Sequence, residues 1–134
     1  MLERQRRDKS KLANEITISL QEKEVTAGQE LHGRVAISYG GRWDSVVINS
    51  QIENSSDVFS YSLINSKKVN HPYARLSIFR TELKGATTVD FVASTKHVPP
   101  PGASNVKFRV SLIQEHKEIY SDIAYIRVVA PASG

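Results

Sequence analysis

The chain has 134 residues, of which 24% are charged, with no cysteine and a formal net charge of +4. This length predicts one domain with a single hydrophobic core. The lack of cysteine excludes disulfides, thiolate metal sites and a cysteine nucleophile, and we interpret it as typical of a cytoplasmic protein. The sequence has no apolar run near the roughly 18 residues of a membrane span.

The positive charge is concentrated at the N-terminus. Five basic residues, Arg4, Arg6, Arg7, Lys9 and Lys11, stand there against Glu3 and Asp8. One interpretation is a solvated terminus. The other is an arm that binds an acidic partner, an anionic surface or nucleic acid through Arg4, Arg6 and Arg7. We therefore predict a basic flexible arm at 1–14, one domain at 15–130 and a disordered tail at 131–134.

The stretch from Glu15 to Tyr39 predicts two strands joined by a charged turn. Its apolar and polar residues alternate, as in strands with one buried face. The apolar positions are Ile16, Ile18 and Leu20 in the first strand, and Leu31, Val35, Ile37 and Tyr39 in the second. Gly28 stands where the turn needs conformational freedom. Gly33 interrupts the inner face, where a bulge or the close approach of another backbone would fit.

The same alternation continues along the chain. It predicts strands at 45–53, 58–64, 87–94, 106–112 and 118–130, and either a strand or an irregular crossing at 73–83. Residues 65–72 are polar and rich in turn formers, which predicts a loop. Residues 97–102 hold three consecutive prolines and predict a surface connection, because proline donates no backbone N–H. The pattern indicates an all-β fold, an antiparallel immunoglobulin-like β-sandwich of seven to eight strands.

Two stretches resemble arrestin-like domains. Ala27 to Gly33 has the order A-G-x-x-x-x-G at the start of the second strand, and residues 90–128 place a Pro-rich crossing between strands around Phe91 and Phe108. The resemblance covers about residues 15–129. It implies a curved sandwich with a scaffold or adaptor role, whose early strands lie near a sheet edge. Arrestins carry two such sandwiches in tandem and this chain has room for one, so no residue of their interdomain ion-pair switch is carried over.

The sequence offers no catalytic or metal-binding pattern. The four histidines, His32, His71, His97 and His116, lack ligand spacing, and we interpret them as surface residues. None of the serines lies in a nucleophile motif, and Gly40-Gly41 lacks the lysine and helix of a phosphate loop. We therefore predict a protein that is not an enzyme and has no cofactor and no metal.

Arg42 and Trp43 follow these two glycines and form a candidate partner-binding pair. One interpretation places Trp43 over one end of the core, where aromatic side chains bury well. The other makes Arg42 and Trp43 exposed contact residues, since both types are enriched at binding hot spots.

The predicted function is a non-catalytic scaffold or adaptor domain that binds another protein. The alternative is a nucleic-acid or anionic-surface binder that uses the basic arm. Exposed edge strands can pair with a partner or with a second copy of the chain to give a homodimer. The resemblance points to 15–21 or 31–39 as that edge, and predicts that Ser19→Pro blocks pairing there.

Overall fold

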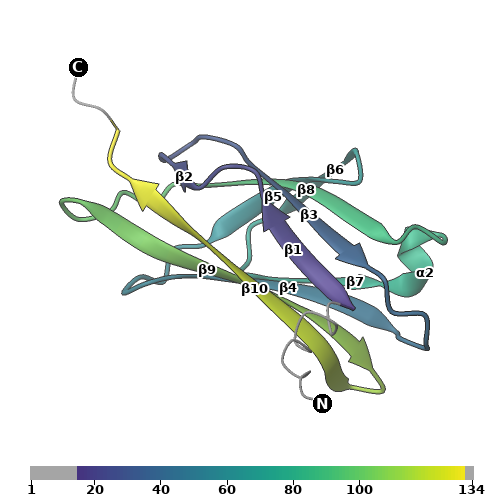
Figure 1. The fold of residues 1–134 in the computed structure, drawn as a ribbon. Coiled ribbons are helices and arrows are strands. Elements are labelled where there is room, and N and C mark those ends of the chain that lie inside the picture. Colours follow the sequence, from purple (N-terminus) through teal and green to yellow (C-terminus); the bar gives the residue numbers. More distant parts are fainter. Residues whose placement is uncertain (1–14, 132–134) are drawn as a thin grey trace, which may run out of the picture.

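The computed structural model describes residues 15–131, which form two facing five-stranded sheets (Figure 1). In chain order the strands are β1 (Ile16–Leu20), β2 (Glu24–Val25), β3 (Leu31–Ile37), β4 (Ser45–Ile52), β5 (Phe59–Ile64), β6 (Lys67–His71), β7 (Arg75–Phe79), β8 (Thr88–Thr95), β9 (Ala103–Gln114) and β10 (Lys117–Val129). A short helix, α2 (Arg80–Leu83), follows β7. Within 15–131 no helix is long and apolar enough to span a membrane.

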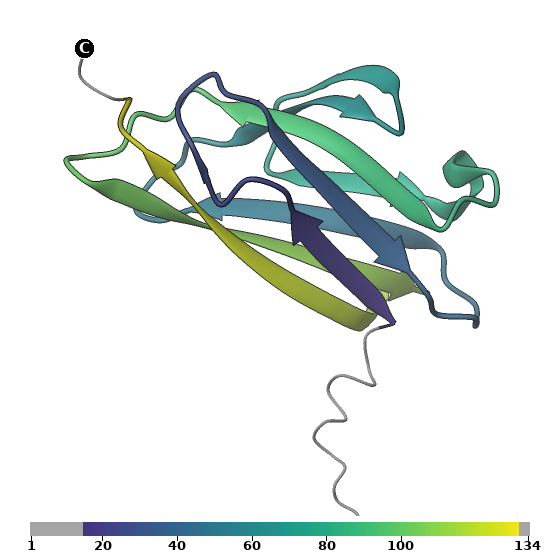
Figure 2. The same cartoon turned by 45° about the horizontal axis from the view of Figure 1, so that its top comes forward.

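The sheets have the orders β1-β3-β8-β5-β6 and β2-β10-β9-β4-β7. All neighbouring strands pair antiparallel except β2, which runs parallel to β10. In the rotated view of Figure 2, β1 crosses close to β10 on one side of the sandwich, and the β5–β6 hairpin and β7 border the other. The chain therefore changes sheet between β6 and β7, on the side away from β1.

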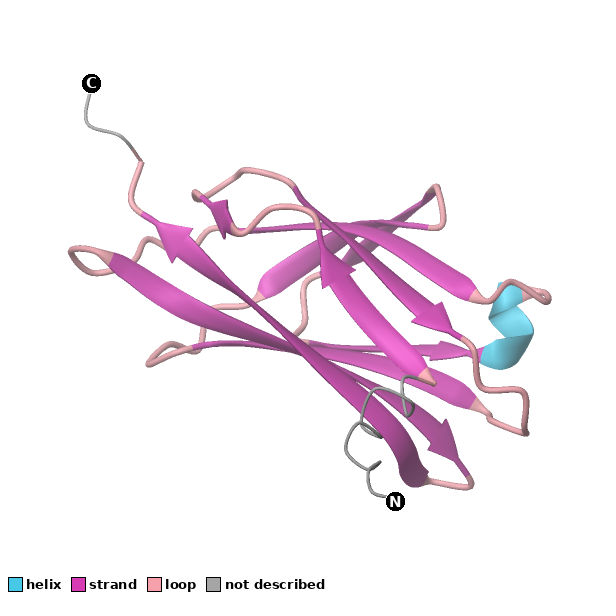
Figure 3. Ribbon diagram, in the orientation of Figure 1, coloured by secondary structure: helices cyan, strands magenta, loops and turns pink. Residues whose placement is uncertain are grey.

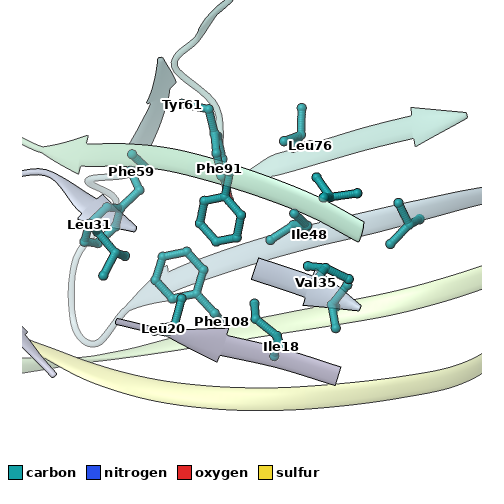
Figure 4. Packing of buried hydrophobic residues seen from close by; sticks show 14 of the residues in the cluster. Ile18, Leu20, Leu31, Val35, Ile48, Phe59, Tyr61, Leu76, Phe91 and Phe108 are labelled. Atoms are coloured by element: carbon teal, nitrogen blue, oxygen red, sulfur yellow. The ribbon is translucent and has the colours of Figure 1, made fainter. Parts of the chain in front are cut away.

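Large apolar side chains fill the space between the sheets. Phe59, Phe91 and Phe108 are at most 2% exposed and contact one another through their rings, with centroids 5.3 Å and 6.2 Å apart (Figure 4). Tyr61 packs edge-on against Phe91 at 5.5 Å. These rings come from both sheets, so they hold the two layers together.

Gly33 leaves room for one of these rings. It lies directly opposite Phe91 in the β3–β8 register, on the inner face of the sheet. A Cβ at position 33 would overlap the Phe91 ring. The glycine in the predicted inner face therefore reflects the close approach of a side chain.

The predicted β-sandwich is confirmed, and Figure 3 shows how little of the described chain is helical. The number of strands is larger than predicted. Residues 65–72, interpreted as a loop, contain strand β6, because Asn65 and Ser66 form a two-residue turn with φ of 47° and 68°. Such turns fold a chain straight back on itself. The segment 73–83 resolves into strand β7 followed by α2.

Substitution of Gly33 tests the role of the Phe91 ring. We expect Gly33→Ala to lower the free energy of unfolding by about 1–3 kcal/mol, the usual cost of overpacking a core. Gly40→Ala is the matched control, because a Cβ there has no heavy atom within 4 Å. Denaturant unfolding of the two variants measures the difference, and equal stabilities would contradict this account of the packing.

Candidate functional site

The structure decides between the two interpretations of Trp43 and leaves Arg42 as a candidate. Trp43 is 5% exposed and belongs to the core, and the Arg80 guanidinium lies 4.7 Å from the centre of its ring. The interpretation of Trp43 as an exposed contact residue therefore fails, because its indole is already packed. Arg42 remains a candidate partner contact. Arg4, Arg6 and Arg7 fall outside the described residues, as does the rest of the predicted arm.

His97 was wrongly interpreted as a surface residue. It is 7% exposed, and both ring nitrogens have partners. Nδ1 lies 2.8 Å from Asp57 Oδ2, and Nε2 lies 2.9 Å from Ser104 Oγ. An ionised carboxylate only accepts, so Nδ1 donates a hydrogen bond to Asp57, and the second nitrogen, Nε2, is paired with the Ser104 hydroxyl. This is the Asp–His–Ser order of a hydrolase triad.

The burial of Ser104 opposes a catalytic role. Ser104 is 2% exposed at the start of β9, so a substrate carbonyl cannot reach its hydroxyl without displacing the residues that cover it. The chain of hydrogen bonds instead ties the turn at Asp57 to the segment after β8 and to β9. We interpret it as a structural connection that satisfies a buried imidazole.

Acid should weaken this connection. The hydrogen bond from His97 holds the pKa of Asp57 below its usual range. A carboxyl whose pKa is lowered by folding stabilises the protein above its unfolded pKa, about 4, and this stability is lost as pH falls through the lowered value. We expect Asp57→Asn to flatten the fall in unfolding temperature below about pH 4. Matching acid profiles for wild type and variant would contradict this.

The outer face of the first sheet carries a shallow concave patch of about 470 Å³. Its charges already have partners. Arg34 contacts Asp90 at 2.6 Å, which holds the pKa of that carboxyl below its usual range, and His32 contacts Glu22 at 2.8 Å. Paired and exposed groups such as these are ordinary for a sheet surface, so the patch is a weaker candidate than the sheet edges.

The edge of β1 is covered by the second sheet. The Ile18 N–H points away from β3 and donates to Asp122 Oδ2 of β10 at 2.9 Å. The Gln21 N–H, three residues on, donates to the His32 C=O near the start of β3. Because backbone groups alternate along a strand, Ser19 faces β3, and Ser19→Pro would break the sheet instead of blocking the edge. The prediction made for that variant is wrong.

The other predicted edge, 31–39, is not an edge. It forms β3, which lies between β1 and β8. β2, at one edge of the second sheet, is only two residues long and pairs with the end of β10. Neither offers a length of free backbone on which another strand could pair.

The edge of β7 is capped at both ends. Ala74 C=O and Arg80 N–H face β4, so Arg75, Ser77 and Phe79 face outward. The His71 ring reaches Arg75 C=O at 2.6 Å, and Glu82 accepts the Phe79 N–H at 3.2 Å. Ser77 is then the one residue of β7 with both backbone groups open to another strand.

The edge of β6 has no such caps. The two-residue turn makes Ile64–Lys67 a hydrogen-bonded pair with β5, so the backbone groups of Lys68 and Asn70 face outward. Both residues are exposed. Within 15–131 no side chain hydrogen-bonds to these outward groups. β6 is therefore the strand edge best able to accept another chain.

A cleft of about 680 Å³ lies between β6 and β7. Its apolar lining residues are Ile64, Val69, Leu76, Ile78, Leu83 and Ala86, and its charged ones are Lys67, Glu82 and Lys84. A strand that paired with β6 would point alternate side chains into this cleft. We call β6 and this cleft the β6 site.

Hydrogen exchange in the free protein tests this description of the edges. We expect the Lys68 and Asn70 amides to exchange rapidly and the Ile18 amide slowly. Asp122→Ala should speed exchange at Ile18 by about tenfold or more, since hydrogen bonds to charged groups contribute about 1.5–3 kcal/mol. Asp122→Asn, which keeps an acceptor oxygen, is the control. Slow exchange at Lys68 and Asn70 would show that their amides are protected.

No family model and no curated protein matches the chain in sequence. Its fold is similar to that of solved β-sandwich structures. A conjugative transposon lipoprotein of Bacteroides eggerthii matches with a TM-score of 0.51 and 10% identity over 86% of this chain and 97% of that one. The SafD adhesin of Salmonella matches with a TM-score of 0.52 and 12% identity over 88% and 99%.

A third similar structure is CfaE, the adhesive subunit of the CFA/I fimbria of enterotoxigenic Escherichia coli. It matches with a TM-score of 0.55 and 15% identity over 91% of this chain and 50% of CfaE. At these identities the likeness shows the fold alone. The prediction of an arrestin-like domain is wrong, because the similar structures are lipoproteins, adhesins and other sandwiches, not arrestins. The glycines that suggested it serve a turn at Gly28, where φ is 86°, and the Phe91 contact at Gly33.

Sequence reasoning missed both the His97 network and the β6 site. Asp57, His97 and Ser104 lie far apart in the chain, and no spacing links them. For β6 one signal was present. The segment KKVNH puts Val69 between polar residues, and the preceding Asn65-Ser66 pair could have been interpreted as a hairpin turn.

Proposed function

We propose that the protein is a non-catalytic binding domain that holds an extended segment of a partner protein by strand addition at the β6 site. The observation that carries this proposal is the difference between the strand edges. β1 donates to Asp122 and β7 is capped by His71 and Glu82, whereas β6 keeps outward backbone groups at Lys68 and Asn70. Main-chain hydrogen bonds to such an edge give affinity, and pockets for alternate side chains give specificity.

The cleft supports the same proposal. An added strand would lie about 4.8 Å from β6, over the opening between the two sheets. Its inward side chains would contact Val69 on one wall and Ile78 on the other, both of which line the cleft. The edge would thus supply hydrogen bonds and the cleft would supply apolar contact. The predicted scaffold or adaptor role is retained in this form.

The predicted homodimer is a less favourable use of the same edge. Two copies of β6 side by side would gather four lysines, Lys67 and Lys68 of each chain, along one short edge. Lysine on an edge strand is a common defence against such pairing. We therefore propose a different protein, not a second copy, as the occupant.

A displayed library of random segments of about ten residues, longer than a typical strand, tests the proposal. Segments selected on the wild-type domain should bind Asn70→Pro at least about tenfold more weakly, because proline removes an outward N–H and adds a ring at the edge. Asn70→Ala, which keeps the N–H, should bind as wild type does. Circular dichroism and thermal unfolding confirm that both variants fold.

Hydrogen exchange locates the bound segment independently of the affinities of the variants. In the complex, the amides of Lys68 and Asn70 should become protected from hydrogen exchange. Selected segments that bind Asn70→Pro as tightly as wild type, or that leave these two amides unprotected, would overturn the proposal. Failure to select any segment above a scrambled library would overturn it as well.

A further inference from the structure

The segment of the chain that contains the β6 site is strongly basic. Residues 65–88 contain five basic residues, Lys67, Lys68, Arg75, Arg80 and Lys84, against the single acid Glu82. This excess of four equals the net charge of the whole chain. The net charge of the chain still lies mostly in the N-terminal segment, because residues 13–134 carry a net charge of only +1. The domain is close to neutral in total because acidic residues elsewhere balance this segment.

These cations are not neutralised within the described part of the chain. The ion pairs there join His32, Arg34, His97, Arg109 and Arg127 to carboxylates, and none involves a basic residue of 65–88. Arg80 stacks on Trp43 and keeps its charge. The one acid, Glu82, lines the same cleft as Lys67 and Lys84 and balances only one of their two charges. The site thus carries an excess of positive charge that a ligand could balance.

Two of the lysines lie where a ligand would pass. Lys67 is opposite Ile64 in the β5–β6 register and lines the cleft on the β6 wall. Lys84 lines the cleft where the chain leaves α2 and is exposed. An ammonium group therefore stands on the β6 wall and another near α2, with the apolar residues Val69 and Ile78 also in the lining.

We infer that the occupant of the β6 site is an acidic extended peptide segment, with apolar side chains directed into the cleft and carboxylates beside Lys67 and Lys84. This inference rests on the proposed strand addition and specifies its ligand. The charges select the partner, because an added strand with lysines would be repelled and a neutral one would leave the ammonium groups unpaired. The lining of the cleft favours a peptide over nucleic acid, because it holds apolar side chains and no aromatic ring on which a base could stack; the exposed rings of Tyr73 and Phe79 lie outside it.

Three synthetic peptides of about ten residues test the inference, with valines alternating with glutamates, with serines or with lysines. We expect the glutamate peptide to bind about three- to tenfold more tightly than the serine peptide at low salt, and the lysine peptide to bind most weakly. The preference for glutamate should fade as ionic strength rises. Isothermal titration below the self-association limit of each peptide measures these affinities.

The variant Lys67→Glu/Lys84→Glu should reverse the order of the glutamate and lysine peptides. The matched control, Lys107→Glu/Lys117→Glu, makes the same change in net charge at exposed positions on β9 and β10 and should keep the wild-type order. A control that reverses the order as strongly would assign the effect to overall charge and overturn the inference. So would an unchanged order in the Lys67/Lys84 variant.

The exchange of two amides separates failure of the inference from failure of the proposed function. Protection of Lys68 and Asn70 by the serine peptide, with no preference for glutamate, would retain strand addition and reject an acidic ligand. Glutamate-peptide binding that leaves both amides exposed would reject strand addition at β6. No binding by the glutamate peptide, or its displacement by a single-stranded DNA oligonucleotide of equal charge at a lower concentration, would overturn the inference.

Discussion

The arrangement of the first sheet depends on the contact between Gly33 and the Phe91 ring. A side chain at position 33 would occupy the space that the ring fills, so β3 lies beside β8 at this register without strain only when glycine is there. The register of β3 in turn places β1, which pairs with it from Ile16 to Leu20. A shift of one residue would turn the apolar side chains of β3 to the outer face. The missing Cβ and the apolar face of β3 together favour the register that sets which backbone groups of β1 face the second sheet.

Because β1 is placed in this way, the two sides of the sandwich differ in how well their edge strands are covered. On the β1 side, a carboxylate from β10 accepts the Ile18 N–H, so the two sheets are joined across the edge. On the β6 side, the chain passes from one sheet to the other through Pro72 and the strands diverge around the cleft. The caps on β7 leave Ser77 as its one residue with both outward backbone groups open. The structure thus protects three of its four outer strands and leaves the fourth, β6, available.

The alternation of apolar residues predicted the sandwich and most of its strands, because the period of two depends only on neighbours along the chain. It failed at β6, where a polar strand follows a turn made by Asn65 and Ser66, because serine is a residue type that seldom adopts the positive φ that Ser66 has. It could not find the caps on the edges either. Ile18 and Asp122 are 104 residues apart, and their contact exists only after the sheets pack.

The candidate site was hidden for a different reason. Net charge summed over a chain carries no information about where charges gather once strands are brought together. Lys67 and Lys84 are separated by a whole strand and a helix, yet both line one cleft. Each of these lysines taken alone is an ordinary exposed side chain. They become part of a candidate binding site only because they lie beside the uncapped edge of β6, and no local sequence pattern reveals that edge.

The same lysines would have opposite effects on the two kinds of strand that could reach β6. Beside a second copy of β6 they repel, and screening by salt relaxes that repulsion. Beside an acidic segment they attract, and salt weakens the attraction. Self-association and partner binding at this edge should therefore respond in opposite directions to ionic strength. An uncharged edge would give no such separation, because backbone hydrogen bonds do not distinguish one strand from another. The lysines beside β6 thus allow this free edge to accept an acidic segment and to disfavour a second copy of the chain.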